Sequence, residues 1–486
     1  MVVIAIVATI WLIRGLDARK MPDLAIWHTH DLENEFHARD YPDGIGFEQY
    51  QQLEADLDAE LNEKIYRSSD ASGRGQFNRY DKTSRVFPDP TGQNWNRSFE
   101  LNSANPAGGI LLLHGASDSP YSVRLLSEYF SKKGFYVLVL RIPGNGTIPS
   151  GLKNAQLEDW LSITRMGAQR AREKVGPDVP LYLGGYSVGS ALVLDYTLDA
   201  LTDASLVVPD RLFLYSPAIG ITKFARFSAW DMTISAIPYF EKFAWMSIQP
   251  EFDPYKYNSF AKNAGHITHL LTERLRSKIL AKKTSTSWQS MPPIITFQSL
   301  VDSTVQTGSL VSELYVHLPE NGSELILFDV NRANDFQHFI VDSERRTLDQ
   351  LQEGQATSFS FTLVTNKTGG TMSVQARTRQ AGEEDFSAED LKGSWPAGVY
   401  SLSHVAIPFD VTDPWYGAVN QFDGKRVLTI GAVAPRGEQG LLTVPSSQLM
   451  RLRHNPFFGY VAQRTAGFCS ACSQDEAGNT AAIPAN

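Results

Sequence analysis

A serine held between two glycines is the clearest candidate for covalent chemistry in this sequence. The segment G-Y-S-V-G spans residues 185 to 189, with Ser187 at its centre. It ends the apolar run LYLGG, which is typical of a buried strand, and precedes SALVLDYTLDAL, whose pattern predicts an amphipathic helix. On a sharp turn between strand and helix, glycines relieve crowding and the serine hydroxyl stands clear of the sheet edge. We therefore expect Ser187 to act as a nucleophile.

A serine that attacks a carbonyl needs hydrogen-bond donors for the oxyanion that develops. The backbone N–H of Val188, directly after the serine, is the first expected donor. The second is the N–H of Ala116, which follows the apolar run GILLL and the turn-forming Gly115. We expect the neighbouring His114 to brace this loop, because the base should lie downstream of the serine in the chain.

These residues need a sheet that brings distant turns to one edge. Apolar runs separated by helical stretches fall at 109 to 115, 136 to 141, 181 to 187, 211 to 218, 292 to 302 and 324 to 330. Such strands alternating with helices indicate an α/β fold, a mostly parallel sheet with helices on both faces and a site beyond the strand C-termini. Neither a G-x-G-x-x-G after the first run nor a P-loop motif occurs, so dinucleotide and P-loop chemistry are not expected.

Composition excludes several classes of protein. The chain has 486 residues, of which 42% are hydrophobic and 20% charged, as in globular proteins rather than disordered or polytopic membrane chains. Lys and Arg number 44 against 53 Asp and Glu, a net charge of -9 that argues against nucleic-acid binding. We expect no metal and no organic cofactor. The only cysteines, Cys469 and Cys472, are interpreted as incidental thiols in a mobile tail, with a local disulfide as the alternative.

The N-terminus carries a membrane signal. Residues 1 to 13 are apolar without interruption, and three basic residues follow by position 20. As a helix this run rises only about 20 Å, which is short for a hydrocarbon core of about 30 Å. No small-residue cleavage site follows it, which argues against a signal peptide. We expect an uncleaved single-pass anchor. The basic residues after it favour a cytoplasmic catalytic domain, but charges lost through a late start codon could reverse this, so the side stays open.

Several motifs together resemble the α/β-hydrolase superfamily. They are LLLHGASDSPYSVR, VLRIPGNGT, GGYSVGSALVLDY and FQSLVDSTV. The segments NWNRSFEL, DPYKYNSF, NGSELILFDVNR, SLSHVAIPF and LMRLRHNPFF further resemble a bacterial branch of serine hydrolases with an N-terminal membrane segment, related to lysophospholipase- and carboxylesterase-like proteins. The resemblance covers about 25 to 462 and implies an α/β-hydrolase fold, a helical cap and an inner-membrane location. Asn145 departs from the pattern, since many members have histidine in that turn.

The expected organisation follows from these signals. We expect an anchor at 1 to 20, a helical lead-in at 21 to 100, the hydrolase domain at 101 to 462 and a disordered tail at 463 to 486. The cap insertion is expected at about 219 to 290, where aromatic residues crowd the first part. Most of these aromatics should form the core of the cap, and some should line an apolar acyl pocket.

The resemblance implies a triad acid just after the strand PPIITFQSL, where Asp302 lies. A carboxylate at a strand C-terminus, on the same sheet edge as Ser187, can accept the imidazole N–H and fix its tautomer. The alternative is a helix N-cap, because Asp-Ser-Thr also precedes a helical pattern.

The base is a choice between His404 and His338. Spacing favours His338, a few residues after ELILFDV, but it adjoins an amphipathic helix between two phenylalanines, a setting that suits a structural role. His404 lies in the apolar stretch YSLSHVAIP, where Pro408 marks a loop. The resembling branch carries its S-H-V-A-x-P-F motif here, so we expect His404.

Together these residues predict a serine hydrolase that cleaves carboxylic esters through an acyl-enzyme, with a small-molecule or lipid ester as substrate. Acyl transfer to another acceptor or thioester hydrolysis could use the same triad. A catalytically silent, membrane-anchored binding protein is the alternative from another class. Acyl length and oligomeric state are left open.

Overall fold

The computed structural model describes residues 20–68, 77–88, 93–220, 238–367, 370–418, 421–422, 425–426 and 450–472. The predicted anchor, apart from Lys20, and the first part of the predicted cap lie outside these residues. Among the helices of the described ranges, none is both long and apolar enough to cross a membrane.

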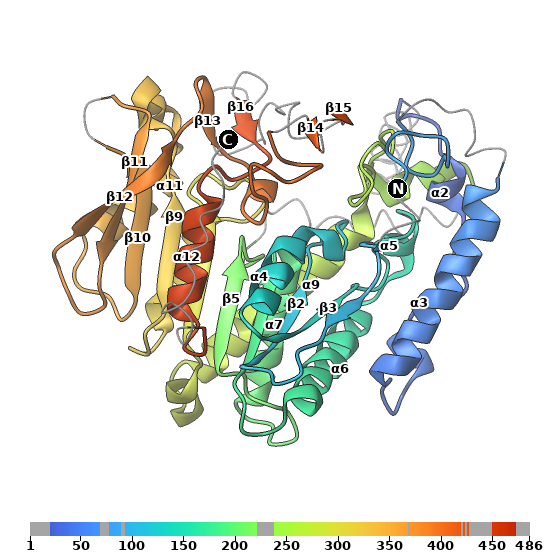
Figure 1. Ribbon diagram of the computed structural model, residues 1–486, viewed down its shortest axis with the longest axis horizontal. Coiled ribbons are helices and arrows are strands. Elements are labelled where there is room, and N and C mark those ends of the chain that lie inside the picture. The colour runs from blue at the N-terminus through green and yellow to red at the C-terminus, as the bar shows by residue number, and fades with distance from the viewer. Residues whose placement is uncertain are drawn as a thin grey trace, which may run out of the picture.

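A ten-stranded sheet forms the centre of the described chain (Figure 1). Its strands stand in the order β1-β3-β2-β4-β5-β8-β9-β10-β11-β12. Their bounds are β1 (Phe99–Leu101), β2 (Gly109–Leu113), β3 (Tyr136–Leu140), β4 (Leu181–Tyr186), β5 (Arg211–Tyr215), β8 (Ile294–Ser299), β9 (Glu324–Phe328), β10 (Ser360–Asn366), β11 (Ser373–Arg379) and β12 (Ser387–Ser394). The seven strands from β3 to β10 are parallel, whereas β1, β11 and β12 run antiparallel to their neighbours. The predicted α/β class with a mostly parallel sheet is confirmed.

Helices cover both faces because the inner strands are apolar on both sides. In β2, Leu111 and Leu113 belong to the core under α6, α7 and α9, while Ile110 and Leu112 belong to the core under α4 and α12. The helix bounds are α4 (Arg124–Lys132), α6 (Leu157–Val175), α7 (Val188–Ala200), α9 (Lys262–Lys282) and α12 (Phe458–Phe468). The parallel strands therefore end together at one edge between two helical layers.

Further elements surround this frame. The lead-in contains α2 (Ile26–Thr29) and α3 (Phe47–Leu61), and α3 packs against α6. Other helices are α5 (Gly151–Asn154), α10 (Thr307–Ser309) and α11 (Asp342–Glu353). Short strand pairs are β6 (Trp245–Ser247) with β7 (Phe260–Ala261), β13 (Val399–Leu402) with β16 (Met450–Leu452), and β14 (Gln421–Phe422) with β15 (Lys425–Arg426).

The polar stretch after β10 is part of the sheet rather than a loop over the surface. Strands β11 and β12 lie within the largely polar residues 370 to 396. Val374 and Ala376 of β11 are buried at alternate positions, a weak signal among polar neighbours. The outermost strand β12 is exposed along nearly its whole length and carries Glu389, Asp390 and Lys392, charges typical of an edge strand that must not pair further.

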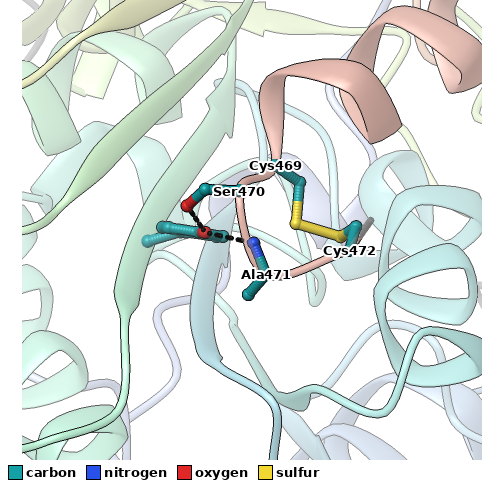
Figure 2. The surroundings of a disulfide bond; sticks show 5 residues. Cys469, Ser470, Ala471 and Cys472 are labelled. Carbon is teal, nitrogen blue, oxygen red and sulfur yellow. Dashed lines mark hydrogen bonds between the residues drawn. A yellow bond between two sulfur atoms is a disulfide. The ribbon is translucent and has the colours of Figure 1, made fainter. Parts of the chain in front are cut away.

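The C-terminal segment also differs from the expectation of a mobile tail with free thiols. Helix α12 reaches Phe468, and Cys469 and Cys472 are joined by a disulfide (Figure 2). Both cysteines are buried. Between them, Ser470 and Ala471 lie within hydrogen-bond distance of the Tyr182 hydroxyl on β4 (Figure 2). This segment is ordered because it is buried against the sheet. The polar composition of the tail does not reveal that contact.

Candidate active site

Ser187 lies on the predicted turn between β4 and α7. Its backbone has φ 55° and ψ -116°, a conformation that serine rarely adopts. Gly189 lets the start of α7 lie directly against the end of β2, since a Cβ there would come within 2.3 Å of the Leu113 carbonyl oxygen. The turn leaves Ser187 8% exposed, with its hydroxyl at the wall of a cavity. This geometry is that of a nucleophile elbow.

The imidazole of His404 lies between Ser187 and Asp302. His404 Nε2 is 3.0 Å from Ser187 Oγ, and Nδ1 is 2.7 Å from Asp302 Oδ2. His404 is 6% exposed and Asp302 is fully buried. Nδ1–H donates to the carboxylate, so Nε2 carries the lone pair that accepts the serine proton. The arrangement can deprotonate Ser187 as its hydroxyl attacks.

Asp302 serves both purposes that its sequence position suggested. It follows β8 at the sheet edge, and its Oδ1 accepts the backbone N–H groups of Thr304 and Val305 at 2.9 and 3.1 Å. Its Oδ2 is the atom that faces His404. Capping the turn with one oxygen fixes the direction in which the other oxygen points.

His338, which spacing favoured, is not in the site. His338 lies in the 3-10 helix Phe336–Phe339 and is exposed to solvent. His404 instead follows β13, which pairs with β16 outside the central sheet, so 102 residues separate it from Asp302 in sequence. The added strands β10 to β12 account for much of this separation without moving the histidine away from the sheet edge.

The two expected oxyanion donors lie near Ser187, Val188 next to it in the chain and Ala116 in the wall of the same cavity. Val188 begins α7, and Gly115 packs so closely that a Cβ there would lie 3.1 Å from Ser187 Cβ. Within the described residues, neither the Val188 nor the Ala116 N–H donates a hydrogen bond to another backbone group. Both N–H groups therefore stay the predicted oxyanion donors.

His114 braces the loop that carries Ala116. Its Nδ1–H donates to the Gly115 carbonyl at 2.7 Å, and its Nε2 accepts the Ile142 N–H at 2.9 Å. Burial lowers the pKa of His114 to about 3, so the ring is neutral. The nearby Asn145 is fully buried and donates to Ile142 and Pro143 carbonyls, so its side chain closes the turn rather than facing a substrate.

A cavity of about 450 Å³ opens in front of Ser187 and His404. Its apolar wall includes Met246, Phe260 and Val305. Of the aromatics expected in the cap, Phe243 and Trp245 are buried. Phe224, Phe227 and Trp230 lie outside the described residues, as do the side chains of Tyr239 and Phe240. The described part of the insertion thus supplies an apolar wall, through residues that the aromatic pattern did not single out.

Known proteins similar to this chain include lipases. A stretch of 112 residues is 29% identical to a thermostable monoacylglycerol lipase of Bacillus sp. (strain H-257), covering 23% of this chain and 43% of that enzyme. The chain therefore spans less than half the length of this curated relative. No protein-family model matches the chain.

Solved structures of lipases also resemble it. The monoacylglycerol lipase of Paleococcus ferrophilus has a TM-score of 0.36 and 16% identity, covering 48% of this chain and 88% of that one. A soluble variant of the monoglyceride lipase of Saccharomyces cerevisiae has a TM-score of 0.35 and 14% identity, covering 48% and 82%.

The parallel sheet and the strand–serine–helix turn after β4 decide the fold class. The chain has an α/β-hydrolase fold. The order serine, acid, histidine along the chain is the order that this fold uses.

Proposed function

We propose that this protein is a serine hydrolase that cleaves carboxylic esters, in the manner of carboxylesterases or lysophospholipases, through an acyl-enzyme intermediate. The observation that carries the proposal is the position of the His404 ring, 3.0 Å from Ser187 Oγ and 2.7 Å from Asp302 Oδ2. The 112-residue similarity to one monoacylglycerol lipase supports a lipid monoester as substrate.

The reaction proceeds in two steps. Ser187 Oγ attacks the ester carbonyl while His404 Nε2 takes its proton, and Asp302 stabilises the imidazolium. The Val188 and Ala116 N–H groups hold the oxyanion. As the tetrahedral intermediate collapses, His404 returns the proton to the leaving alcohol, and the acyl group stays on Ser187. Water, deprotonated by His404, then releases the carboxylic acid and restores the serine.

The cavity walls favour esters with an apolar acyl chain. Met246, Phe260 and Val305 line the cavity beside Ser187 and offer an apolar surface to an acyl chain. An acyl chain buried there leaves water and gains contacts with these side chains, which favours medium or long chains over acetyl esters.

The proposal extends to the membrane. We infer that residues 1 to 20 anchor the protein to the bacterial inner membrane, close to lipid esters. The support is the uninterrupted apolar run at residues 1 to 13 followed by basic residues.

Hydrolysis of p-nitrophenyl esters of graded acyl length tests the function. The wild-type protein should release p-nitrophenol, and Ser187→Ala should lower kcat/KM by about a thousandfold or more, because the covalent step is lost. Circular dichroism should show that this variant is folded. Unchanged turnover in folded Ser187→Ala would overturn the proposal.

A further inference from the structure

A second cavity adjoins the ester site. Its volume is about 270 Å³, and it shares Asp118, Lys256, Tyr257, Asn258 and Val405 with the apolar cavity in front of Ser187. Charged side chains from three segments far apart in sequence line it, and two of them, Asp118 and Lys256, also line the apolar cavity. The charged side chains are Asp118, Asp253, Lys256, Arg451 and Arg453. The mechanism proposed for ester hydrolysis does not use this second cavity.

Among the charged residues of this cavity, Arg453 is the candidate for binding a ligand. It follows the end of β16, and β16 pairs in parallel with β13, after which His404 comes. The Ser403 N–H donates to the Leu452 carbonyl at 3.1 Å, which fixes the two strand ends side by side. Arg453 is half-buried, yet within the described chain its guanidinium has neither an ion pair nor a hydrogen bond to a protein group. A partly desolvated guanidinium with five free donors favours an anionic ligand.

Lys256 joins the two compartments. Its ammonium lies 3.1 Å from Ser117 Oγ and 3.2 Å from Asp118 Oδ2, so two of its three donor hydrogens are engaged and one is left. Ser117 adjoins the oxyanion donor Ala116, which places this cation beside the reaction centre. Lys256 can therefore contact a ligand that extends from Ser187 toward Arg453.

The other charged groups are mostly satisfied by the protein. Arg451 donates to the Val301 and Leu402 carbonyls, both at 2.7 Å. Asp253 Oδ1 accepts the Tyr416 hydroxyl at 2.7 Å, while its buried Oδ2 accepts no hydrogen bond from the described residues. With three cations and two carboxylates, the lining holds one positive charge in excess and one oxygen that can accept a hydroxyl.

We infer that this second cavity binds an anionic group, phosphate or carboxylate, on the alcohol portion of the ester substrate. The inference rests on the proposed function, because an ester has two portions and the site has two compartments. The apolar cavity suits the acyl chain, so the charged cavity receives the alcohol. Arg453 pairs with the anion, Lys256 contacts the part nearer the ester, and Asp253 Oδ2 accepts a hydroxyl.

Turnover of two matched esters tests the inference. The wild-type protein should have a higher kcat/KM for 1-octanoylglycerol 3-phosphate than for 1-octanoylglycerol, both below their micellar concentrations. Arg453→Gln should lower kcat/KM for the phosphate ester by about tenfold or more, since it removes a charge-assisted hydrogen bond, and should act mainly through KM. The neutral ester should be unaffected.

Two control variants separate recognition from folding. Arg453→Lys keeps the charge and should retain much of the preference. Arg346→Gln removes the same charge from an exposed position on α11 and should change neither ester. The inference is wrong if the wild type shows no preference, or if Arg453→Gln lowers both esters equally.

A binding measurement distinguishes this inference from the proposed function. Calorimetry on Ser187→Ala should detect binding of glycerol 3-phosphate or of glycerate, identifying the anion, and no binding of glycerol. Loss of that binding in Ser187→Ala/Arg453→Gln supports the site even if neither ester is hydrolysed. Absence of binding of either anion contradicts it even if esters are hydrolysed.

Discussion

Ser187 holds a conformation that costs stability. A non-glycine residue at φ 55° is strained by about 1 to 3 kcal/mol, and surrounding contacts must offset this strain. The Ser187 N–H donates to Tyr215 at 2.9 Å, and its carbonyl accepts the Ala218 N–H at 3.1 Å. Both hydrogen bonds connect the serine backbone to the end of β5 and the segment that follows it. The strain is consistent with a position selected for its hydroxyl direction rather than for stability.

Substitution of His404 and of His338 should have different effects on ester turnover. His404→Ala should lower ester kcat/KM by about a thousandfold or more, because the proton acceptor for Ser187 is lost. His338→Ala should leave turnover unchanged, because His338 is exposed and lies outside the site. Steady-state kinetics on one p-nitrophenyl ester measures both. A large loss in His338→Ala with full turnover in His404→Ala would reverse the assignment.

At the scale of elements, helix α12 and its disulfide hold the C-terminal segment against the sheet. Tyr460 and Val461 of α12 are buried in the core beneath it, and the Thr465 hydroxyl lies 3.1 Å from that of Tyr215 on β5. Strand β5 adjoins β4, which carries Ser187. The C-terminal segment therefore completes one layer of the fold without entering the site.

Removing the disulfide should weaken the protein but leave its chemistry intact. Cys469→Ser/Cys472→Ser should lower the free energy of unfolding by about 2 kcal/mol, a modest effect because the closed loop is short. Urea unfolding measures the change, and ester turnover should not alter. Reducing agent should destabilise the wild type similarly and have no effect on the double variant. Equal stability of both proteins would show that the bond contributes nothing.

Elements that bury an apolar face were predictable, and elements that depend on distant contacts were not. The elbow could be predicted because an apolar strand and an amphipathic helix flank Ser187 directly. His404 could not be placed by spacing, since β10 to β12 lengthen the chain before it. Strands β11 and β12 escaped prediction because an edge strand needs few apolar residues.

The residues of the second cavity could not be predicted from the sequence either. Lys256 and Arg453 are ordinary surface residue types in sequence, 197 positions apart. Only the docking of the insertion on the Ser117 loop and the pairing of β13 with β16 bring them to one cavity. Each segment carried a motif, DPYKYNSF or LMRLRHNPFF, without a function that sequence reasoning could attach to it.

At the scale of the whole molecule, the proposed membrane anchor precedes in sequence the residues that form the sheet and its helical layers. The sheet and its helical layers are formed by residues from 99 onward, with α3 packed at the side. Deleting residues 1 to 20 should move the protein from the membrane fraction to the soluble fraction without changing turnover of a soluble ester. Fractionation and kinetics measure both properties. An insoluble, inactive product would mean that the run belongs to the fold.

Labelling with a fluorophosphonate tests whether His404 and Asp302 activate Ser187. Such a probe reacts with an activated serine, and mass spectrometry of the digested protein identifies the residue. We predict labelling of wild-type protein at Ser187, loss of the label in Ser187→Ala and His404→Ala, and retention in His338→Ala. A wild-type protein that stays unlabelled, or a label on another serine, would contradict the account.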